Sequence, residues 1–198
     1  PKNLIFDMDG TLYELDGENG TFKNSSLSLS VIGNSIRFVM EREGCTLEAA
    51  TEFIKEAQKD KIGISNVLSK KYGITRSDVF DNTWNIEPAL IIKKFETSVQ
   101  IINRLQESGK KMFLLTAAPR IWMENVITHL NLSDRFERKI NGEMFGEKSE
   151  IFKILSEEFG VFNIMSIGDQ FDTDIKPALE VGMKALQVSV PEDLKKLI

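Results

Sequence analysis

Apolar residues in the second half of the chain alternate between helical spacing and short continuous runs. Val99, Ile102 and Leu105 recur at helical intervals before Gly109, and residues 112–115 then form an unbroken apolar run. A short apolar run bounded by such breaks is typical of a strand that is buried on both faces. This stretch therefore predicts a helix followed by a buried strand.

The same alternation continues toward the C-terminal end, and another apolar run opens the chain at residues 4–6. The further helical stripes are Trp122, Val126 and Leu130 and then Phe152, Leu155 and Phe159, and the further strand-like runs are residues 162–167 and 185–190. Strands that alternate with helices form a parallel sheet covered by helices on both faces. The pattern therefore predicts an α/β fold with a doubly wound, Rossmann-like parallel sheet and a ligand site at the carboxyl ends of the strands.

Residues 16–94 differ from the rest of the chain in the spacing of their apolar residues. Helical patterns follow one another there, and no strand-like run lies between them. The patterns cover residues 31–43, 46–59, 65–72 and 77–84, with glycines between them. Thr75 and Asp78 have the spacing of a capping box at the start of the last of these helices. We therefore expect a small α-helical domain at 16–94, inserted into a core domain made of residues 1–15 and 95–198.

The composition of the chain restricts the classes of protein to which it can belong. The chain has 198 residues, 41% of them hydrophobic, which is enough to bury a substantial core. No apolar run approaches the roughly 20 residues that span a bilayer, and the N-terminal segment lacks the pattern of a signal peptide. We therefore expect a cytoplasmic protein without a membrane partner. Cys45 is the only cysteine, which excludes an intramolecular disulfide.

The net charge of the chain restricts the kinds of ligand and partner that it can bind. The net charge is −5 and the pI is near 5.1, so the chain offers no broad basic field for nucleic acid. A small anionic ligand is still compatible with this balance, because one local site can be basic in an acidic protein. His129 is the only histidine, which excludes metal sites built from several histidines. The sequence leaves the oligomeric state open.

Two carboxylates follow the first predicted strand. Asp7 and Asp9 come directly after the run at 4–6, and their spacing places both side chains on one side of extended backbone. Gly10 then permits a sharp turn. Asp-Met-Asp is followed by Gly-Thr-Leu, a combination that is rare by chance at ordinary composition. We therefore expect two acids to face one point at the carboxyl end of this strand.

Three more acids follow a second predicted strand, because Asp169, Asp172 and Asp174 come after the run that ends at Ile167. Parallel strands bring these positions to the same edge of the sheet as the first pair. Crowded carboxylates repel one another unless a cation is present, and a set of oxygen ligands suits Mg²⁺. The sequence therefore predicts a magnesium site at this edge.

Thr116 and Lys148 complete the set of polar residues expected at this edge. Thr116 follows the predicted strand at 112–115 and offers a hydroxyl together with the next backbone N–H, and Lys148 begins a predicted helix. A hydroxyl, an amide and a compact positive charge suit the oxygens of a transferring phosphoryl group.

Together these segments resemble the four ordered motifs of the haloacid dehalogenase superfamily, within its aspartate-nucleophile phosphatases. They are Asp-Met-Asp-Gly-Thr-Leu at 7–12, the apolar run into Thr116, Lys148 before a helix, and Gly-Asp-Gln-Phe-Asp-Thr-Asp at 168–174. The resemblance covers both core segments, and the insertion matches in position and helical character only. It lies between the first and second motifs, where that family carries a helical cap.

The resemblance implies a role for each matching residue. Asp7 would be the nucleophile that attacks phosphorus, and Asp9 would be the acid and base for the leaving group and for water. Mg²⁺ would be held by the Asp7 carboxylate, the Asp9 carbonyl oxygen and Asp169. The residues expected at the substrate phosphate are Asp7, Met8, Asp9, Thr116, Ala117 and Lys148. From the residues alone, which of the two aspartates attacks stays open.

Two positions depart from the commonest family pattern. Thr173 stands where the second aspartate of the last motif is usual, and the Asp-Thr-Asp variant resembles a subgroup that keeps the aspartate after the threonine. We therefore expect Asp174, rather than Asp172, to support the metal. Ala117 stands where asparagine or glycine is frequent, so its backbone N–H is kept and a side-chain contact is lost.

The resemblance implies a Mg²⁺-dependent phosphomonoester hydrolase that acts on a small soluble phosphorylated metabolite through a phosphoaspartate. A phosphomutase of the same superfamily and a non-catalytic phosphate-binding module are the alternatives. Nucleotides, sugar phosphates and phosphoglycolate all stay open as substrates. A helical cap would close over the substrate and supply specificity.

A second group of residues is expected near the cap. Tyr13 and Glu14 lie at the first hinge, where they are candidates for gating or substrate contact. Arg120 begins a predicted helix and is a candidate for contact with substrate or cap. The aromatic residues expected to pack the cap, with one or two reaching the pocket, are Phe38, Phe53, Tyr72, Phe80 and Trp84.

Overall fold

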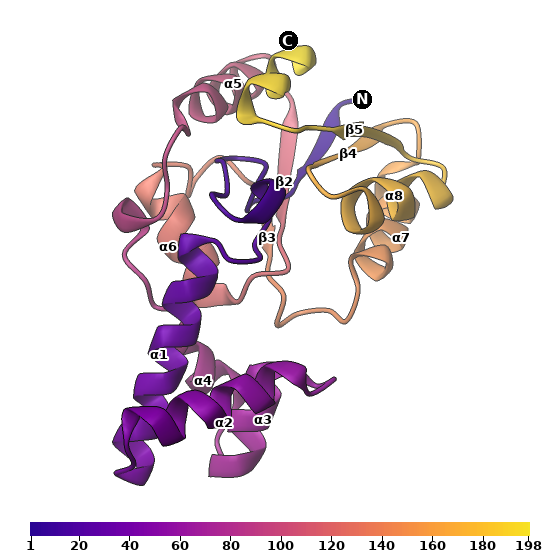
Figure 1. Ribbon diagram of the computed structural model, residues 1–198. Coiled ribbons are helices and arrows are strands. Elements are labelled where there is room, and N and C mark those ends of the chain that lie inside the picture. The colour runs from indigo at the N-terminus through magenta and orange to yellow at the C-terminus, as the bar shows by residue number, and fades with distance from the viewer.

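A five-stranded parallel sheet forms the centre of the computed structural model, which describes all residues 1–198 (Figure 1). Its strands are β1 (Asn3–Phe6), β2 (Lys111–Leu115), β3 (Arg138–Ile140), β4 (Ile164–Gly168) and β5 (Lys184–Gln187). Their order is β3-β2-β1-β4-β5, with Ile5 of β1 paired to Phe113 on one side and to Ser166 on the other. The predicted α/β fold with a parallel sheet is therefore confirmed. Strand order reverses between β1 and β4, where doubly wound folds place their ligands.

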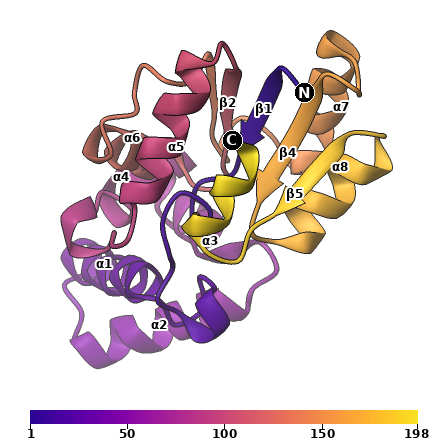
Figure 2. The same ribbon diagram turned by 90° about the horizontal axis from the view of Figure 1, so that it is seen from above.

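Alternate residues of β1 face two different hydrophobic clusters, one on each side of the sheet. Leu4 and Phe6 pack with residues of α5 (Glu96–Glu107), α6 (Arg120–His129) and the C-terminal 3₁₀ segment η4 (Pro191–Leu197). Ile5 packs with residues of α7 (Lys148–Phe159) and α8 (Lys176–Glu180). Figure 2 shows these two groups of helices on opposite sides of the sheet. Both faces of the sheet are thus buried, as a parallel sheet requires.

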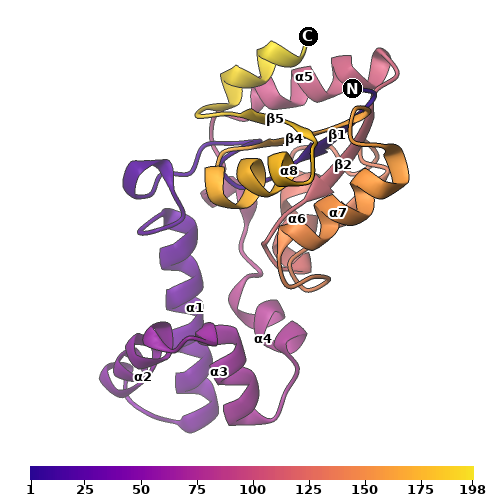
Figure 3. The same cartoon turned by 90° about the vertical axis from the view of Figure 1, so that its right-hand side faces the viewer.

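Four helices form a separate bundle beyond the sheet (Figures 1 and 3). They are α1 (Ser26–Glu43), α2 (Leu47–Lys59), α3 (Gly63–Tyr72) and α4 (Arg76–Thr83). Phe38, Ile54, Leu68 and Val79, one from each helix, belong to a hydrophobic cluster distinct from those of the sheet. No helix here or elsewhere in the structure combines the length and the apolar character needed to cross a bilayer.

The ends of the bundle helices are fixed by polar side chains. The predicted capping box at α4 is present, because Thr75 Oγ1 accepts a hydrogen bond from the Asp78 amide at 3.0 Å and the Asp78 carboxylate accepts one from the Thr75 amide at 3.1 Å. α1 begins five residues before the predicted start at 31. The cause is Ser25, whose hydroxyl accepts a hydrogen bond from the Ser28 amide at 3.0 Å and so caps an earlier turn.

Chain segments on both sides of the bundle also pack on the core. Leu15, Ile86, Ile91 and Ile92 belong to the hydrophobic cluster around β1 and α6. The division into two domains at residues 16 and 94 therefore stays a prediction. All four bundle helices lie between these two positions.

The sheet differs from the prediction at its two edges. β3 was not predicted, because it has three residues and its first two, Arg138 and Lys139, are exposed. β5 ends at Gln187, three residues before the predicted end at 190. The amide of Ser189 instead donates to the Asp193 carboxylate at 2.8 Å, which turns the chain into η4.

Candidate active site

The first motif and the last motif lie side by side at the reversal of strand order. Asp7 follows β1 and Asp169 follows β4, and the amide of Asp7 donates to the Ile167 carbonyl at 2.9 Å. Gly10 has a φ of +88°, and a Cβ at this position would lie 2.4 Å from Asp169 Oδ2. A glycine is therefore needed where the loop after β1 turns past Asp169.

A buried lysine joins two of the acids. Lys148 is the first residue of α7, and its Nζ lies 2.7 Å from Asp7 Oδ1 and 2.7 Å from Asp174 Oδ1. Burial acts to lower the pKa of Lys148, but the charges of these two carboxylates outweigh it and hold that pKa above its usual range. Lys148 is thus a fixed positive charge, and the structure brings it to Asp7 as the sequence predicts.

Three carboxylates converge beside this lysine. Oxygen atoms of Asp7, Asp169 and Asp174 all lie within 4.8 Å of one another. Burial, with the charges of Asp7 and Asp174, raises the pKa of Asp169 to about 8. Burial and Asp7 likewise raise the pKa of Asp174, against the opposing effect of Lys148. A compact set of hard oxygen donors that repel one another fits a divalent cation such as Mg²⁺.

The choice between the two acids of the last motif has a clear geometric basis. Asp174 is 2% exposed and lies in the carboxylate cluster, whereas Asp172 is exposed and lies outside it. A single turn of π-helix (Phe171–Ile175) turns Asp174 inward, and a Cβ on Gly168 would lie 2.4 Å from the Asp174 Cβ. This arrangement favours Asp174, as expected from the Asp-Thr-Asp pattern.

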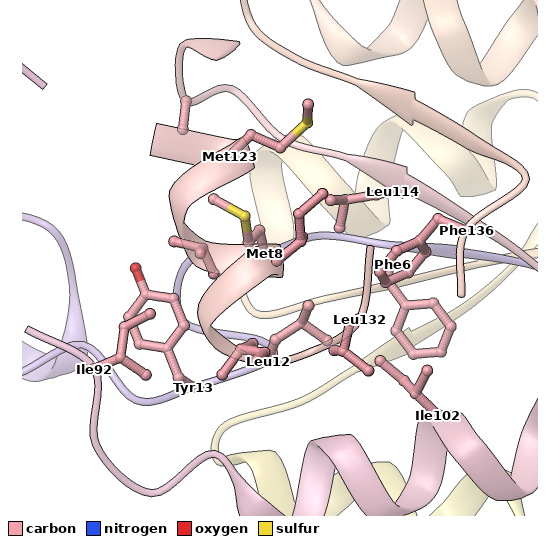
Figure 4. Close-up of a cluster of buried hydrophobic side chains, with 14 of the residues drawn as sticks. Phe6, Met8, Leu12, Tyr13, Ile92, Ile102, Leu114, Met123, Leu132 and Phe136 are labelled. Carbon is pink, nitrogen blue, oxygen red and sulfur yellow. The ribbon is translucent and has the colours of Figure 1, made fainter. Parts of the chain in front are cut away.

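A hydroxyl and free amides lie where a phosphate is expected. Thr116 follows β2, and its hydroxyl accepts a hydrogen bond from the Ala118 amide at 3.1 Å, so its own proton is free to donate. The amides of Met8 and Ala117 donate no hydrogen bond within the chain. The Met8 side chain is buried in the core (Figure 4), so its backbone is the part available to a ligand.

These groups border a cavity of about 660 Å³. Asp7, Asp9, Thr116, Ala117 and Lys148 all contribute to its wall. The first, second and third motifs therefore meet at one opening, and Asp174 brings the fourth motif to the same wall. Asp169 belongs to the carboxylate cluster but lines a neighbouring cavity of about 670 Å³, which shares Gln170 and Asp172 with the first.

Asp9 is held by two side chains that donate to the same oxygen. Its Oδ1 accepts hydrogen bonds from the Tyr13 hydroxyl and from Trp122 Nε1, the latter at 2.8 Å, while Oδ2 accepts none from the protein. Burial raises the pKa of Asp9 to about 6, although both hydrogen bonds act to lower it. A carboxyl group that retains its proton close to neutral pH suits general acid and base chemistry.

Tyr13 has a different place from the one expected. Its side chain is fully buried among core residues that include Leu12 and Ile92 (Figure 4), which excludes gating at an open hinge. Burial raises the pKa of Tyr13 well above its usual range, and the neighbouring Asp9 adds to this effect. Tyr13 therefore acts as a hydrogen-bond donor to Asp9.

Two site residues were missed in the sequence. Trp122 was expected only as part of an apolar helix stripe, although a buried indole N–H generally needs an acceptor and so gives a weak signal. Thr11 lies within the first motif, and its hydroxyl donates to Asp7 Oδ2 at 2.9 Å. Asp7 thus has one oxygen held by Lys148 and the other by Thr11.

The segments next to the bundle also reach the cavity. Phe22 and Trp84 both contribute to its wall, and their rings stack with centroids 5.6 Å apart. Trp84 was among the aromatic residues expected near the pocket, whereas Phe22 was missed because it lies in an irregular segment. Of the other four, Phe38, Phe53 and Tyr72 pack in the bundle cluster, and Phe80 is buried on α4 facing a second cavity.

Ion pairs connect the bundle segments to the core. Glu14 and Lys94, one from each connecting segment, lie 2.9 Å apart. Arg120 of α6 lies 3.8 Å from Asp81 of α4, so it contacts the helical bundle that the sequence predicts as a cap. Both pairs are exposed, which makes each a weak and adjustable link.

Comparison with known proteins identifies the relatives of this chain. The profile of the haloacid dehalogenase-like hydrolases matches residues 1–182. The glyceraldehyde 3-phosphate phosphatase of Methanocaldococcus jannaschii is 24% identical over 203 residues, which cover 94% of this chain and 84% of that protein.

Solved structures agree with this match. A haloacid dehalogenase-type phosphatase from Thermococcus onnurineus aligns with a TM-score of 0.68 at 18% identity, covering 100% of this chain and 97% of that one. An enzyme of the same type from Bacteroides thetaiotaomicron, in complex with magnesium and inorganic phosphate, aligns with a TM-score of 0.58 at 20% identity, covering 100% and 98%. At these identities the structural likeness shows a common fold.

Proposed function

Because this chain belongs to the haloacid dehalogenase-like hydrolases, we propose that it is a Mg²⁺-dependent phosphomonoester hydrolase for a small soluble phosphorylated metabolite. The observation that carries the proposal is the double contact of Lys148, whose Nζ lies 2.7 Å from both Asp7 and Asp174 at the wall of the cavity. A buried lysine placed against a carboxylate orients that carboxylate and leaves positive charge for a phosphoryl group.

Asp7 is the proposed nucleophile. Lys148 and Thr11 each hold one of its oxygens, which restricts rotation of the carboxylate before attack. In the first step a bond forms between an Asp7 oxygen and phosphorus while the bond from phosphorus to the leaving oxygen breaks. The Thr116 hydroxyl, the free amides of Met8 and Ala117 and the Lys148 ammonium are the proposed donors to the phosphoryl oxygens.

Asp9 is the proposed acid and base. In the first step its carboxyl proton passes to the leaving oxygen, so that the alcohol departs neutral. In the second step the Asp9 carboxylate takes a proton from the water that attacks phosphorus in the phosphoaspartate, which returns Asp7 to its starting form. The pKa of Asp9, raised to about 6, supports both duties, because each protonation state is accessible near neutral pH.

Mg²⁺ would be held by the carboxylates of Asp7 and Asp169 and the carbonyl oxygen of Asp9, with Asp174 in support. The crowded carboxylates and the raised pKa values of Asp169 and Asp174 support this assignment. A bound magnesium ion neutralises charge on the transferring phosphoryl group and fixes its orientation. The magnesium and phosphate complex of the Bacteroides thetaiotaomicron enzyme supports the same choice of metal.

The glyceraldehyde 3-phosphate phosphatase activity named for the Methanocaldococcus jannaschii relative supports a small phosphate ester as the substrate class. The bundle of α1–α4, with residues 16–94 as its domain, is the proposed cap. Phe22 and Trp84 stack at the cavity wall and are the side chains through which the cap would cover a small leaving group.

Release of phosphate from p-nitrophenyl phosphate tests the proposal. We expect turnover to require Mg²⁺ and to be lost in Asp7→Asn, because an amide is a poor nucleophile and a poor metal ligand. Asp172→Asn is the matched control, since Asp172 lines the same cavity but lies outside the carboxylate cluster. Near wild-type turnover in Asp7→Asn, or full activity with excess chelator, would contradict the proposal. A requirement for a bisphosphate activator would favour a phosphomutase instead.

A further inference from the structure

A second, smaller cavity lies between the bundle and the core. Its volume is about 290 Å³, and its walls come from α1, α2, α3 and α4 on one side and from Ala117, Pro119 and Gly142 on the other. Phe22, Trp84 and Ala117 line both this cavity and the larger one. The smaller cavity therefore adjoins the proposed phosphate site on the side that faces the bundle.

Arg76 is the only charged residue that lines the smaller cavity. Its Nε donates to the Ser65 hydroxyl at 3.2 Å, and its guanidinium carbon lies 5.1 Å from the centre of the Phe80 ring. No carboxylate forms an ion pair with it. Arg76 is thus a positioned but unpaired cation in a chain whose net charge is −5.

The rest of the wall explains why an unpaired arginine here can select a ligand. Most of the neighbouring side chains are apolar, and Val31, Ile64 and Phe80 are among them. Arg76 itself is exposed to solvent, so its selectivity would come from the fixed direction of its guanidinium group, held by Ser65 and Phe80, more than from the strength of one ion pair. Ser65 and Gln58 supply additional polar groups on the same wall. An arginine fork matches the two oxygens of a carboxylate or of a phosphate.

We propose that Arg76 binds a second anionic group, at the far end of the substrate's leaving group, and so gives the enzyme a preference for phosphate esters of negatively charged metabolites. The inference rests on the proposed phosphatase function and adds a specificity-determining residue to it. The phosphoryl group would lie at Asp7 and Lys148, and the leaving group would pass the Phe22 and Trp84 rings to reach Arg76.

Specificity constants for matched esters test this inference. The probes are a homologous series of phosphorylated ω-hydroxy carboxylic acids, the corresponding neutral amides, and bisphosphates of the same chain lengths, all with p-nitrophenyl phosphate as the reference. For the wild type we expect kcat/KM to favour a charged ester over its amide by about tenfold or more at one chain length. The comparison of carboxylates with bisphosphates identifies which anion Arg76 accepts.

Variants separate recognition from a structural role. Arg76→Gln is expected to reduce the ratio of charged ester to amide to about one, and Arg76→Lys to keep part of it, because lysine retains the charge without the fork. Arg37→Gln is the control, since Arg37 is an exposed arginine of the same bundle that lines neither cavity. We expect it to keep the wild-type ratio.

Two outcomes would overturn the inference. One is an unchanged ratio in Arg76→Gln, with turnover of the charged ester, the amide and the reference lowered by the same factor. The other is a wild type that hydrolyses p-nitrophenyl phosphate but treats charged and neutral esters alike, and this result would leave the proposed function intact. A wild type that hydrolyses none of the esters would overturn both.

Discussion

The indole nitrogen of Trp122 lies 2.8 Å from Oδ1 of Asp9, although the two residues are 113 positions apart. Trp122 belongs to α6 and is completely buried, so the packing of that helix on the sheet sets the position of this donor. Tyr13 donates to the same oxygen. The carboxyl group of Asp9 is therefore oriented by the core, and its Oδ2, which accepts no hydrogen bond from the protein, is the oxygen left for a substrate.

Replacement of Trp122 by Phe removes this donor and keeps an aromatic ring in the core. We expect a loss of kcat/KM for alkyl phosphates of about tenfold, the size expected for a hydrogen bond to a charged group. The loss for p-nitrophenyl phosphate should be smaller, because its leaving group needs little protonation. Steady-state kinetics with both esters measures the difference.

Asp9→Asn removes the proposed acid itself. We therefore expect it to show the largest difference between the loss of kcat/KM for alkyl phosphates and the loss for p-nitrophenyl phosphate. Tyr13→Phe removes the other donor to Oδ1 and is expected to show the same leaving-group dependence as Trp122→Phe. Equal losses on alkyl and nitrophenyl esters in all three variants would mean that Asp9 acts mainly through metal placement, and its role as an acid would be wrong.

The main features of the site could be predicted because each motif is local in the sequence. Asp7, Thr116 and Asp169 directly follow apolar runs, and parallel strands bring such positions to one edge. The family inferred from these motifs is confirmed by the match over residues 1–182. The roles of the individual residues stay predictions, since the comparisons do not test them.

What could not be predicted depends on packing between distant elements. The contact of Trp122 with Asp9 needs the orientation of α6 on the sheet, which periodicity alone does not give. Phe22 lies in an irregular segment and meets Trp84 only because the two connecting segments run together. Arg76 has an ordinary surface position in α4, and the cavity that it lines is formed by the bundle and the core together.

Asp193 gives a pH dependence of stability that can be checked. Its carboxylate accepts hydrogen bonds from Lys196 and from the amides of Ser189 and Val190, and these lower its pKa to about 2. An aspartate in an unfolded chain has a pKa of about 3.9. Because the folded pKa is the lower one, the stabilisation is present above about pH 4 and is lost as the pH falls toward 2.

Asp193→Asn should therefore be less stable than the wild type near neutral pH, by about 1 kcal/mol or less because the group is partly exposed to solvent. The difference should shrink as the pH is lowered through about 3. Urea unfolding at several pH values measures it. Glu192→Gln is the control, since the exposed Glu192 forms no ion pair in the structure. A stability difference independent of pH would contradict the prediction.

The bundle of α1–α4 is expected to move relative to the core when a ligand binds. Only two connecting segments join it to the core, and the ion pair between Glu14 and Lys94 holds these segments together at 2.9 Å. Beryllium fluoride with Mg²⁺, a mimic of a phosphorylated aspartate, should slow amide hydrogen exchange in both segments and near Phe22 and Trp84. Exchange measured by mass spectrometry with and without the mimic tests this. Unchanged exchange throughout the bundle would rule out a mobile cap.

Gly10 offers a test of the metal site that does not depend on catalysis. A Cβ here would lie 2.4 Å from Asp169 Oδ2, so Gly10→Ala must displace the Asp169 carboxylate or the loop that follows Asp9. Displacement of a ligand by a change in its surroundings typically weakens metal affinity tenfold or more, and we expect a loss of at least about tenfold for Mg²⁺. Isothermal titration calorimetry with Mg²⁺ alone measures it.

Gly20→Ala separates the steric effect from backbone strain. Gly20 has a φ of +72° against +88° for Gly10, and nothing lies within 4 Å of the position of its Cβ. Backbone strain should lower the free energy of unfolding by about 1 kcal/mol in both variants, because alanine adopts positive φ reluctantly, and the close contact with Asp169 adds a further cost in Gly10→Ala only. Only Gly10→Ala should also weaken Mg²⁺ binding. Equal Mg²⁺ affinity in the two variants would contradict the expected coupling between Gly10 and the Asp169 carboxylate at the metal site.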